Sequence, residues 1–167
     1  MRILLVLLLF PFISFSQDSL NMSLLGYVDY PNTNGIDIWG WVDSSGNEFA
    51  IVGLRDGVSV VDVTDPSNPD EKFFIADIYS VWRDIKTWNN YAYVTTESDT
   101  GLLIIDLNDM TGSTYWHVKD FISYNLNDTL HIEAAHNLFI DENGYAYIFG
   151  ASNPPGYAAP PNGAIIL

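Results

Sequence analysis

The sequence predicts an all-β fold, a β-propeller of four-stranded blades, of which about two and a half to three blades are present. Two observations lead to this fold class. Short runs of aromatic and aliphatic residues alternate with turn residues, and three of the resulting units resemble one another. Aromatic residues make up 14% of the chain and hydrophobic residues 48%, which suits a packed core of sheet-forming side chains.

Each unit is marked by an alanine between aromatic or aliphatic residues. A turn, a glycine and an aliphatic run follow, and in the first two units the run ends in Asp. Ala50 and Ala92 lie 42 residues apart, and the corresponding Gly57 and Gly101 lie 44 apart. Propeller blades repeat at about 40–50 residues. Ala146 follows 54 residues after Ala92, so the third unit carries insertions.

The units are expected at about residues 36–78, 79–130 and 131–167, with the last one truncated. Their predicted strands are 36–42, 48–54, 57–63 and 72–75, then 81–87, 91–96, 101–107 and 114–118, then 136–140, 145–150 and 164–167. The runs 58–63 and 102–105 do not alternate with polar residues, which is typical of strands covered on both faces. A β-sandwich is the alternative architecture, although it does not require tandem similarity. Residues 24–28 are expected to pair with a missing last blade.

Residues 1–16 have the pattern of a secretory signal peptide. Arg2 supplies the positive charge, residues 3–13 form an apolar run, and Ser14 and Ser16 are small residues before the expected cleavage. The run is shorter than the about 20 residues that span a bilayer, so no transmembrane span is expected. Residues 17–167 are therefore expected to be the N-terminal part of a secreted propeller domain.

The charge balance excludes some partners. The net charge is −15 and there is no cysteine. Such a surface repels the phosphates of nucleic acids and of anionic membranes, and it suits solubility, cationic ligands or divalent ions. An exported chain without disulfides must be stabilised by core packing and strand pairing.

Several segments resemble known repeats. The aliphatic-Asp strand followed by Asp65-Pro66-Ser67-Asn68-Pro69 resembles the LVIVD-repeat family. Four further segments are similar to the choice-of-anchor B family of secreted bacterial proteins: Asp37-Ile38-Trp39-Gly40-Trp41, Trp82-Arg83-Asp84-Ile85-Lys86, Tyr91-Ala92-Tyr93-Val94 and Ala135-His136-Asn137-Leu138-Phe139-Ile140. The resemblance implies a β-propeller body at the cell surface, attached through a C-terminal region that this sequence does not contain. It implies no particular activity.

The candidate site residues lie where innermost strands begin. Asp37, Arg83, Asp84, His136 and Asn137 are expected to gather near one end of the central channel. Three interpretations stay open. His136, Asp84 and Asp37 could form part of a divalent metal site completed by further blades; His136 could act as a general base oriented by Asp84; or the charged residues could form structural ion pairs between blades while His136 binds a neighbouring loop.

Three tryptophans accompany these residues. Trp39 and Trp41 are two positions apart and so share one face of a strand, and Trp82 precedes Arg83. They could stack on a sugar or another planar ligand, or they could wedge between blades. His117 and His131 have no obvious partner in the sequence.

The function predicted from these features is binding. The sequence contains no phosphate-binding loop, nucleophile elbow, zincin helix or cysteine-based zinc motif. The leading hypothesis is an extracellular or cell-surface binding or scaffold propeller that recognises a ligand, glycan or protein at its mouth. The alternatives are a metal-dependent extracellular hydrolase or lyase with a His/Asp site in the channel, and a structural spacer in a surface layer.

Overall fold

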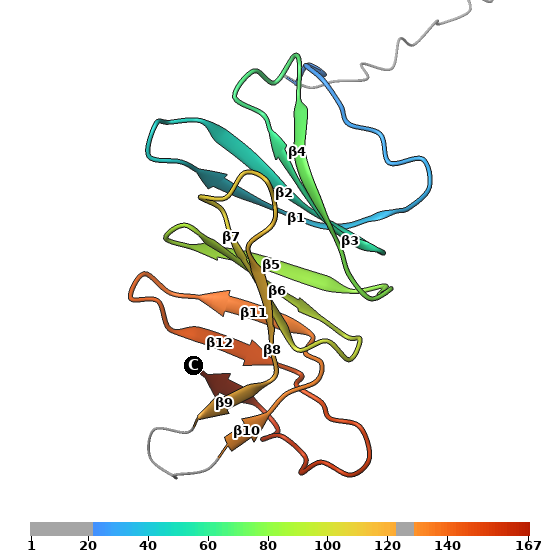
Figure 1. Cartoon of the computed structure of the whole chain (residues 1–167), viewed down its shortest axis with the longest axis vertical. Coiled ribbons are helices and arrows are strands. Elements are labelled where there is room, and N and C mark those ends of the chain that lie inside the picture. Colours follow the sequence, from blue (N-terminus) through green and yellow to red (C-terminus); the bar gives the residue numbers. More distant parts are fainter. Residues whose placement is uncertain (1–21, 123–128) are drawn as a thin grey trace, which may run out of the picture.

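The computed structural model describes residues 22–122 and 129–167. Within these ranges the chain forms strands, turns and bends but no helix, and therefore none long and apolar enough to cross a membrane. Three antiparallel sheets are stacked one above another (Figure 1). The predicted all-β fold of propeller-type blades is confirmed, and the described part forms an open stack of blades. The expected signal peptide lies outside the described residues.

Each sheet is a meander whose strands follow in sequence order, which is the connectivity of a propeller blade. Blade one contains β1 (Gly35–Val42), β2 (Glu48–Leu54), β3 (Gly57–Asp62) and β4 (Asp70–Ala76). Blade two contains β5 (Arg83–Trp88), β6 (Tyr91–Thr96), β7 (Leu102–Asp106) and β8 (Tyr115–Val118). Blade three contains β11 (Asn137–Ile140), β12 (Ala146–Phe149) and β13 (Ala164–Ile166).

Between blades two and three the chain forms a ribbon that the sequence did not predict. β9 (Asp120–Ile122) and β10 (Thr129–His131) pair antiparallel as a separate two-stranded sheet. This ribbon is the insertion that lengthens the spacing from Ala92 to Ala146 beyond the first repeat. From its end the chain runs to the first strand of blade three (Figure 1).

The first strands of the three blades, β1, β5 and β11, lie side by side. Their registers identify equivalent positions, because Ile38 opposes Val52, Ile85 opposes Val94 and Leu138 opposes Ile148. These are the strands that would line the central channel of a propeller.

Each blade packs through two different faces. We call the face that carries Ile38, Ile85 or Leu138 the leading face and the opposite one the trailing face. Ile85 is 0% and Leu138 2% exposed because the preceding blade covers them, whereas Ile38 is 62% exposed. Ile85 packs against Gly53 of β2, so the leading face of blade two meets the trailing face of blade one.

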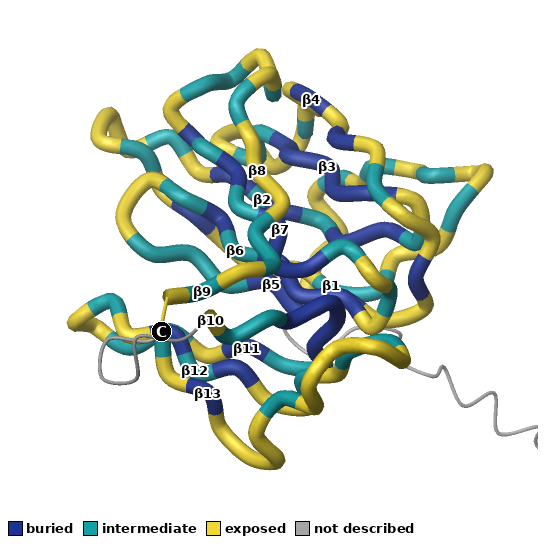
Figure 2. The backbone as a smooth tube through the Cα atoms, turned by 60° about the horizontal axis from the view of Figure 1, so that its bottom comes forward, coloured by how far each residue is buried: buried dark blue, intermediate teal, exposed yellow. Residues whose placement is uncertain are grey.

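On the trailing faces the side chains of blade one are buried and those of blade three are exposed. Phe49 of blade one is 5% exposed, and Tyr145 at the equivalent position of blade three is 56% exposed. Val60 and Ile166 form a second such pair, buried and exposed respectively. The core of the described part therefore lies between blades, where the tube in Figure 2 is coloured as buried along β5 and its neighbours.

The repeated glycine has a steric cause. A Cβ on Gly57 would lie 2.2 Å from the Ile75 carbonyl oxygen, and one on Gly101 would lie 2.5 Å from that of Val118. Gly101 also has a positive φ of 75°. The fourth strand passes so close to the start of the third strand that only glycine fits there.

The repeated Asp at the end of the third strand stabilises the turn that follows the strand. Asp62 accepts the backbone N–H of Thr64 at 3.0 Å, and Asp106 accepts that of Asn108 at 2.9 Å. Hydrogen bonds from the Thr64 hydroxyl and backbone lower the pKa of Asp62. The carboxylate therefore satisfies an amide that leaves the ladder where the strand ends.

The first described residues lie along the leading face of blade one but leave Ile38 mostly exposed. Residues 22–29 contain no strand. Ser23–Val28 and Tyr30 lie over Ile38, Val52 and Val61, with a hollow of about 590 Å³ between the two layers. The expected pairing of residues 24–28 with a last blade stays a prediction.

The packing between blades predicts unequal effects at two equivalent positions. Ile85→Ala removes a fully buried side chain from the joint between blades one and two, and it should destabilise the fold by about 2–5 kcal/mol. Ile38→Ala at the exposed equivalent should change stability by less than about 0.5 kcal/mol. Urea unfolding followed by tryptophan fluorescence measures both. Equal losses would contradict the assignment of leading faces.

Candidate functional site

Three of the residues predicted for the site occupy equivalent positions in the first strands of the three blades. Asp37 opposes Gly53, Asp84 opposes Thr95, and Asn137 opposes Phe149. These three residues are thus equivalent and lie near the same end of the stack. We call this end, where β1, β5 and β11 begin, the mouth.

Both aspartates join one blade to the next. Asp37 Oδ2 accepts the backbone N–H of Ile85 at 2.8 Å, and Asp84 Oδ2 accepts that of Leu138 at 2.6 Å. The Asn137 side-chain amide also donates to Asp84 Oδ2, at 3.5 Å. The second oxygen of Asp84 is bound by Lys86 Nζ at 2.5 Å. One oxygen of each aspartate therefore joins neighbouring inner strands, and the other oxygen of Asp84 is taken by Lys86 of its own strand.

Arg83 is buried between blades one and two. Its guanidinium pairs with the buried Asp77 and donates to the carbonyl oxygens of Leu54 at 2.8 Å and Ile78 at 2.5 Å. Asp77 also contacts His117 Nε2 at 3.1 Å. Because every contact of Arg83 is internal, its geometry favours the structural interpretation of this residue.

His136 lies at the mouth and forms an aromatic pair with Trp82. The two rings are stacked with centroids 4.3 Å apart and planes 10° apart. The Trp82 indole N–H donates to the His136 carbonyl oxygen at 2.6 Å, and His136 Nδ1 lies 2.6 Å from Glu97 Oε1. Trp82 is 37% exposed, and the side chains of His136 and Glu97 are 43% and 48% exposed. We call these three residues the mouth cluster.

Trp39 and Trp41 reach from blade one to blade two. The Trp39 indole N–H donates to Thr87 Oγ1 at 3.1 Å, and Lys86 Nζ lies 4.4 Å from the Trp39 ring centroid. Trp41 is buried, packs on Phe49 and donates to the Asn89 carbonyl oxygen at 3.0 Å. These contacts favour the wedge interpretation for both residues, while Trp39 keeps an exposed edge.

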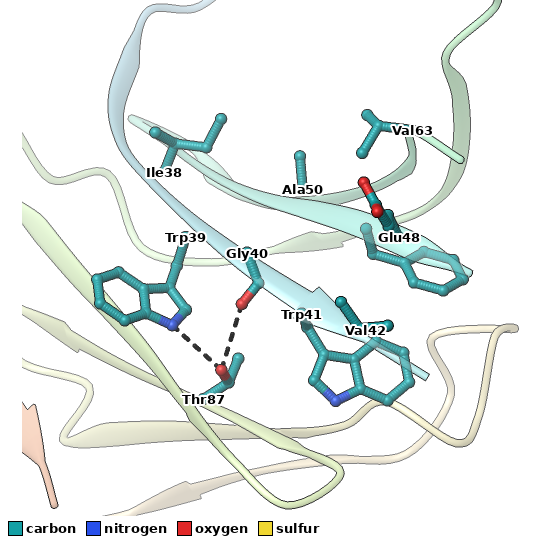
Figure 3. Close-up of a pocket in the computed structure, with 10 residues that line it drawn as sticks. Ile38, Trp39, Gly40, Trp41, Val42, Glu48, Ala50, Val63 and Thr87 are labelled. Carbon is teal, nitrogen blue, oxygen red and sulfur yellow. Dashed lines mark hydrogen bonds between the residues drawn. The ribbon is translucent and has the colours of Figure 1, made fainter. Parts of the chain in front are cut away.

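A shallow open hollow of about 670 Å³ surrounds the end of β1 (Figure 3). Ile38, Ala50 and Val63 project to one side of the strand, and Trp39 and Trp41 project to the other. The lining is mostly apolar and includes the leading face of blade one. The hollow is therefore a feature of an uncovered blade face, and it lies apart from the mouth cluster.

The metal interpretation receives no support from the described geometry. Within residues 22–122 and 129–167, no group of three or more His, Asp or Glu side chains is arranged to hold a metal ion. Asp37 and Asp84 bind backbone amides, and His136 faces Glu97. The metal site stays a prediction about residues that further blades would contribute.

Some residues of this region were missed by sequence reasoning. Glu97 follows β6 at the same end as Arg83, because Arg83 opposes Thr96 in the ladder. The sequence did contain a sign of Glu97, since this carboxylate comes just after the second predicted strand of its unit. Asp77 gave no signal, since it lies in the crossing between blades and its burial depends on Arg83. His117 and His131, which looked unpartnered in the sequence, both contact carboxylates.

The fold and site together define an all-β repeat protein of stacked propeller-type blades. The family model of the LVIVD repeat matches residues 42–77 and 82–112, so the chain contains two regions similar to this repeat. The matches cover most of blades one and two. Searches of curated proteins and of solved structures found no match.

Because Arg83 forms a buried ion pair, its replacement should reduce the stability of the fold strongly. Arg83→Met should cost about 3–5 kcal/mol of unfolding free energy, because it leaves the Asp77 carboxylate buried without its main partner. Arg55→Met is the matched control. The Arg55 guanidinium makes an exposed hydrogen bond to the Tyr79 hydroxyl and lies over the Tyr79 ring, so its loss should cost less than about 1 kcal/mol. Chemical denaturation measures both. A small loss for Arg83→Met would show that this pair is dispensable.

Proposed function

We propose that this chain belongs to an extracellular or cell-surface β-propeller that binds a ligand, glycan or protein at the mouth and acts as a binding or scaffold protein. Export is proposed from the signal-peptide pattern of residues 1–16, and attachment from the resemblance to choice-of-anchor B proteins. The LVIVD matches and the stacked blades support the repeat architecture on which the proposal rests.

The proposal rests on how the polar and aromatic side chains at the mouth divide into those that join blades and those that stay accessible. The aspartates and Arg83 are engaged in joints between blades, whereas Trp82, His136 and Glu97 remain accessible. This division favours binding over catalysis, because Asp84, the residue expected to orient His136 as a general base, is bound to the Leu138 backbone N–H and to Lys86 instead.

The mouth cluster suits recognition of a planar or sugar-like surface. The Trp82 ring is fixed by its stack on His136 and by its N–H bond to the His136 carbonyl oxygen. A side chain already held in place loses little conformational entropy on binding. Glu97 adds a hydrogen-bond acceptor, and the net charge of −15 disfavours anionic ligands.

A calorimetric screen tests the proposal. The probes are chitohexaose, xylohexaose, laminarihexaose and a hexalysine peptide, each titrated into the whole chain. A probe that binds should lose about thirtyfold in affinity with Trp82→Ala, which corresponds to about 2 kcal/mol for an aromatic hot spot.

Trp116→Ala is the matched control for this screen. Trp116 is also exposed, but it lies on the outer strand β8 of blade two. The control should bind the probe like the unaltered chain, and thermal melts should show both variants folded. Equal affinities of the Trp82→Ala variant and the unaltered chain would place recognition elsewhere, and the absence of binding by all four probes would count against these ligand classes.

A further inference from the structure

A second histidine cluster lies where the β9–β10 ribbon meets the chain entering blade three. His131 is the last residue of β10, and its side chain is mostly buried. Its Nδ1 lies 2.6 Å from Asp120 Oδ1 on β9, and its Nε2 lies 3.0 Å from Glu133 Oε1. The other oxygen of Glu133 is paired with Lys119 Nζ at 2.5 Å.

This cluster holds the long loop between β12 and β13, residues 150–163. The Tyr157 ring stacks on the His131 ring with centroids 4.1 Å apart and planes 8° apart. The Asn153 side-chain amide donates to the carbonyl oxygens of His131 and Ala158, each at 2.8 Å. Its oxygen accepts the Glu133 backbone N–H at 2.9 Å. The loop is thus held near its start by backbone bonds between Ser152 and Ala134 and by the bonds of Asn153, and further along by the stack of Tyr157 on the His131 ring.

The two ring nitrogens of His131 require a proton each. A neutral imidazole has one N–H, whereas both nitrogens here face carboxylate oxygens that can only accept. Both contacts are hydrogen bonds only in the imidazolium form. Hydrogen bonds donated by the ring to Asp120 and then to Glu133 raise the pKa of His131, against the opposing effect of burial. The pKa of Glu133 is lowered, first by its hydrogen bond with Lys119.

We propose that the His131 cluster is a protonation-dependent clamp that fixes the β12–β13 loop at the edge of the mouth. The loop starts beside the mouth cluster, because a Cβ on Gly150 would lie 2.7 Å from His136 Cβ. When His131 is charged, it binds both carboxylates and presents a fixed ring to Tyr157. When it is neutral, one carboxylate loses its hydrogen bond and faces a lone pair.

The sign of the pH dependence follows from the two shifted groups. A raised pKa in the folded state means that His131 contributes stability at low pH and loses it as pH rises through that value. The lowered pKa of Glu133 means that this residue contributes stability above its ordinary pKa and loses that contribution as pH falls through the lowered value. Asp120, Glu133, Lys119 and Tyr157 are the titratable groups that face His131 or its partner carboxylate from the ribbon, the linkers and the loop. The clamp should thus be closed below the raised pKa of His131, as long as its partner carboxylates are charged, and it should loosen as pH rises through that pKa.

The test follows His131 and the loop separately in the whole chain. NMR titration of the imidazole should give a pKa above the ordinary 6.5. Amide hydrogen exchange of residues 150–163, corrected for intrinsic rates, should lose protection with the same midpoint. A His131 pKa at or below 6.5, or loop protection that does not change with pH, would overturn the proposal.

Three variants separate the clamp from ordinary destabilisation. Asp120→Asn alters an exposed carboxylate and should shift the His131 pKa and the midpoint of loop release downward together. His131→Asn should leave loop protection low and independent of pH. His117→Asn is the matched control on β8 and should keep the pH dependence of the loop. A midpoint that fails to follow His131 in the Asp120→Asn variant would also refute the clamp. None of these measurements uses a ligand, so they are independent of the outcome of the binding screen.

Discussion

The bond from an inner-strand aspartate to the backbone amide of the next blade is the constraint on which the rest of this structure depends. Asp37 and Asp84 repeat it at equivalent positions, and each joins the first strand of one blade to the first strand of the next. Once these strands are joined, Trp39 and Trp41 reach their acceptors on blade two, and Ile85 closes against Gly53.

This constraint also shapes what the mouth can do. Most of the polar side chains that begin the inner strands have structural contacts and are not free to bind a ligand. What remains available is an aromatic and imidazole surface with one carboxylate. The proposed binding role rests on this surface.

The sequence predicted the architecture well because the repeat encodes local geometry. The glycine and aliphatic-Asp positions each have a steric or hydrogen-bonding cause within one blade, so their recurrence could be interpreted without a structure. The site was predicted less well. Asp37, Arg83, Asp84, His136 and Asn137 were placed at one end of the inner strands, but their partners come from other blades or from crossings such as Asp77. The β9–β10 ribbon escaped notice because its strands contain three residues each and show no periodicity.

The amide accepted by each inner aspartate belongs to the main chain, and this has an evolutionary consequence. A joint that recognises backbone requires no particular side chain at the receiving residue, only that it is not proline. A duplicated or exchanged blade would therefore meet its neighbour without a matched second mutation. Repeats joined in this way can diverge in sequence and be gained or lost as units, while the order in which they face one another is preserved.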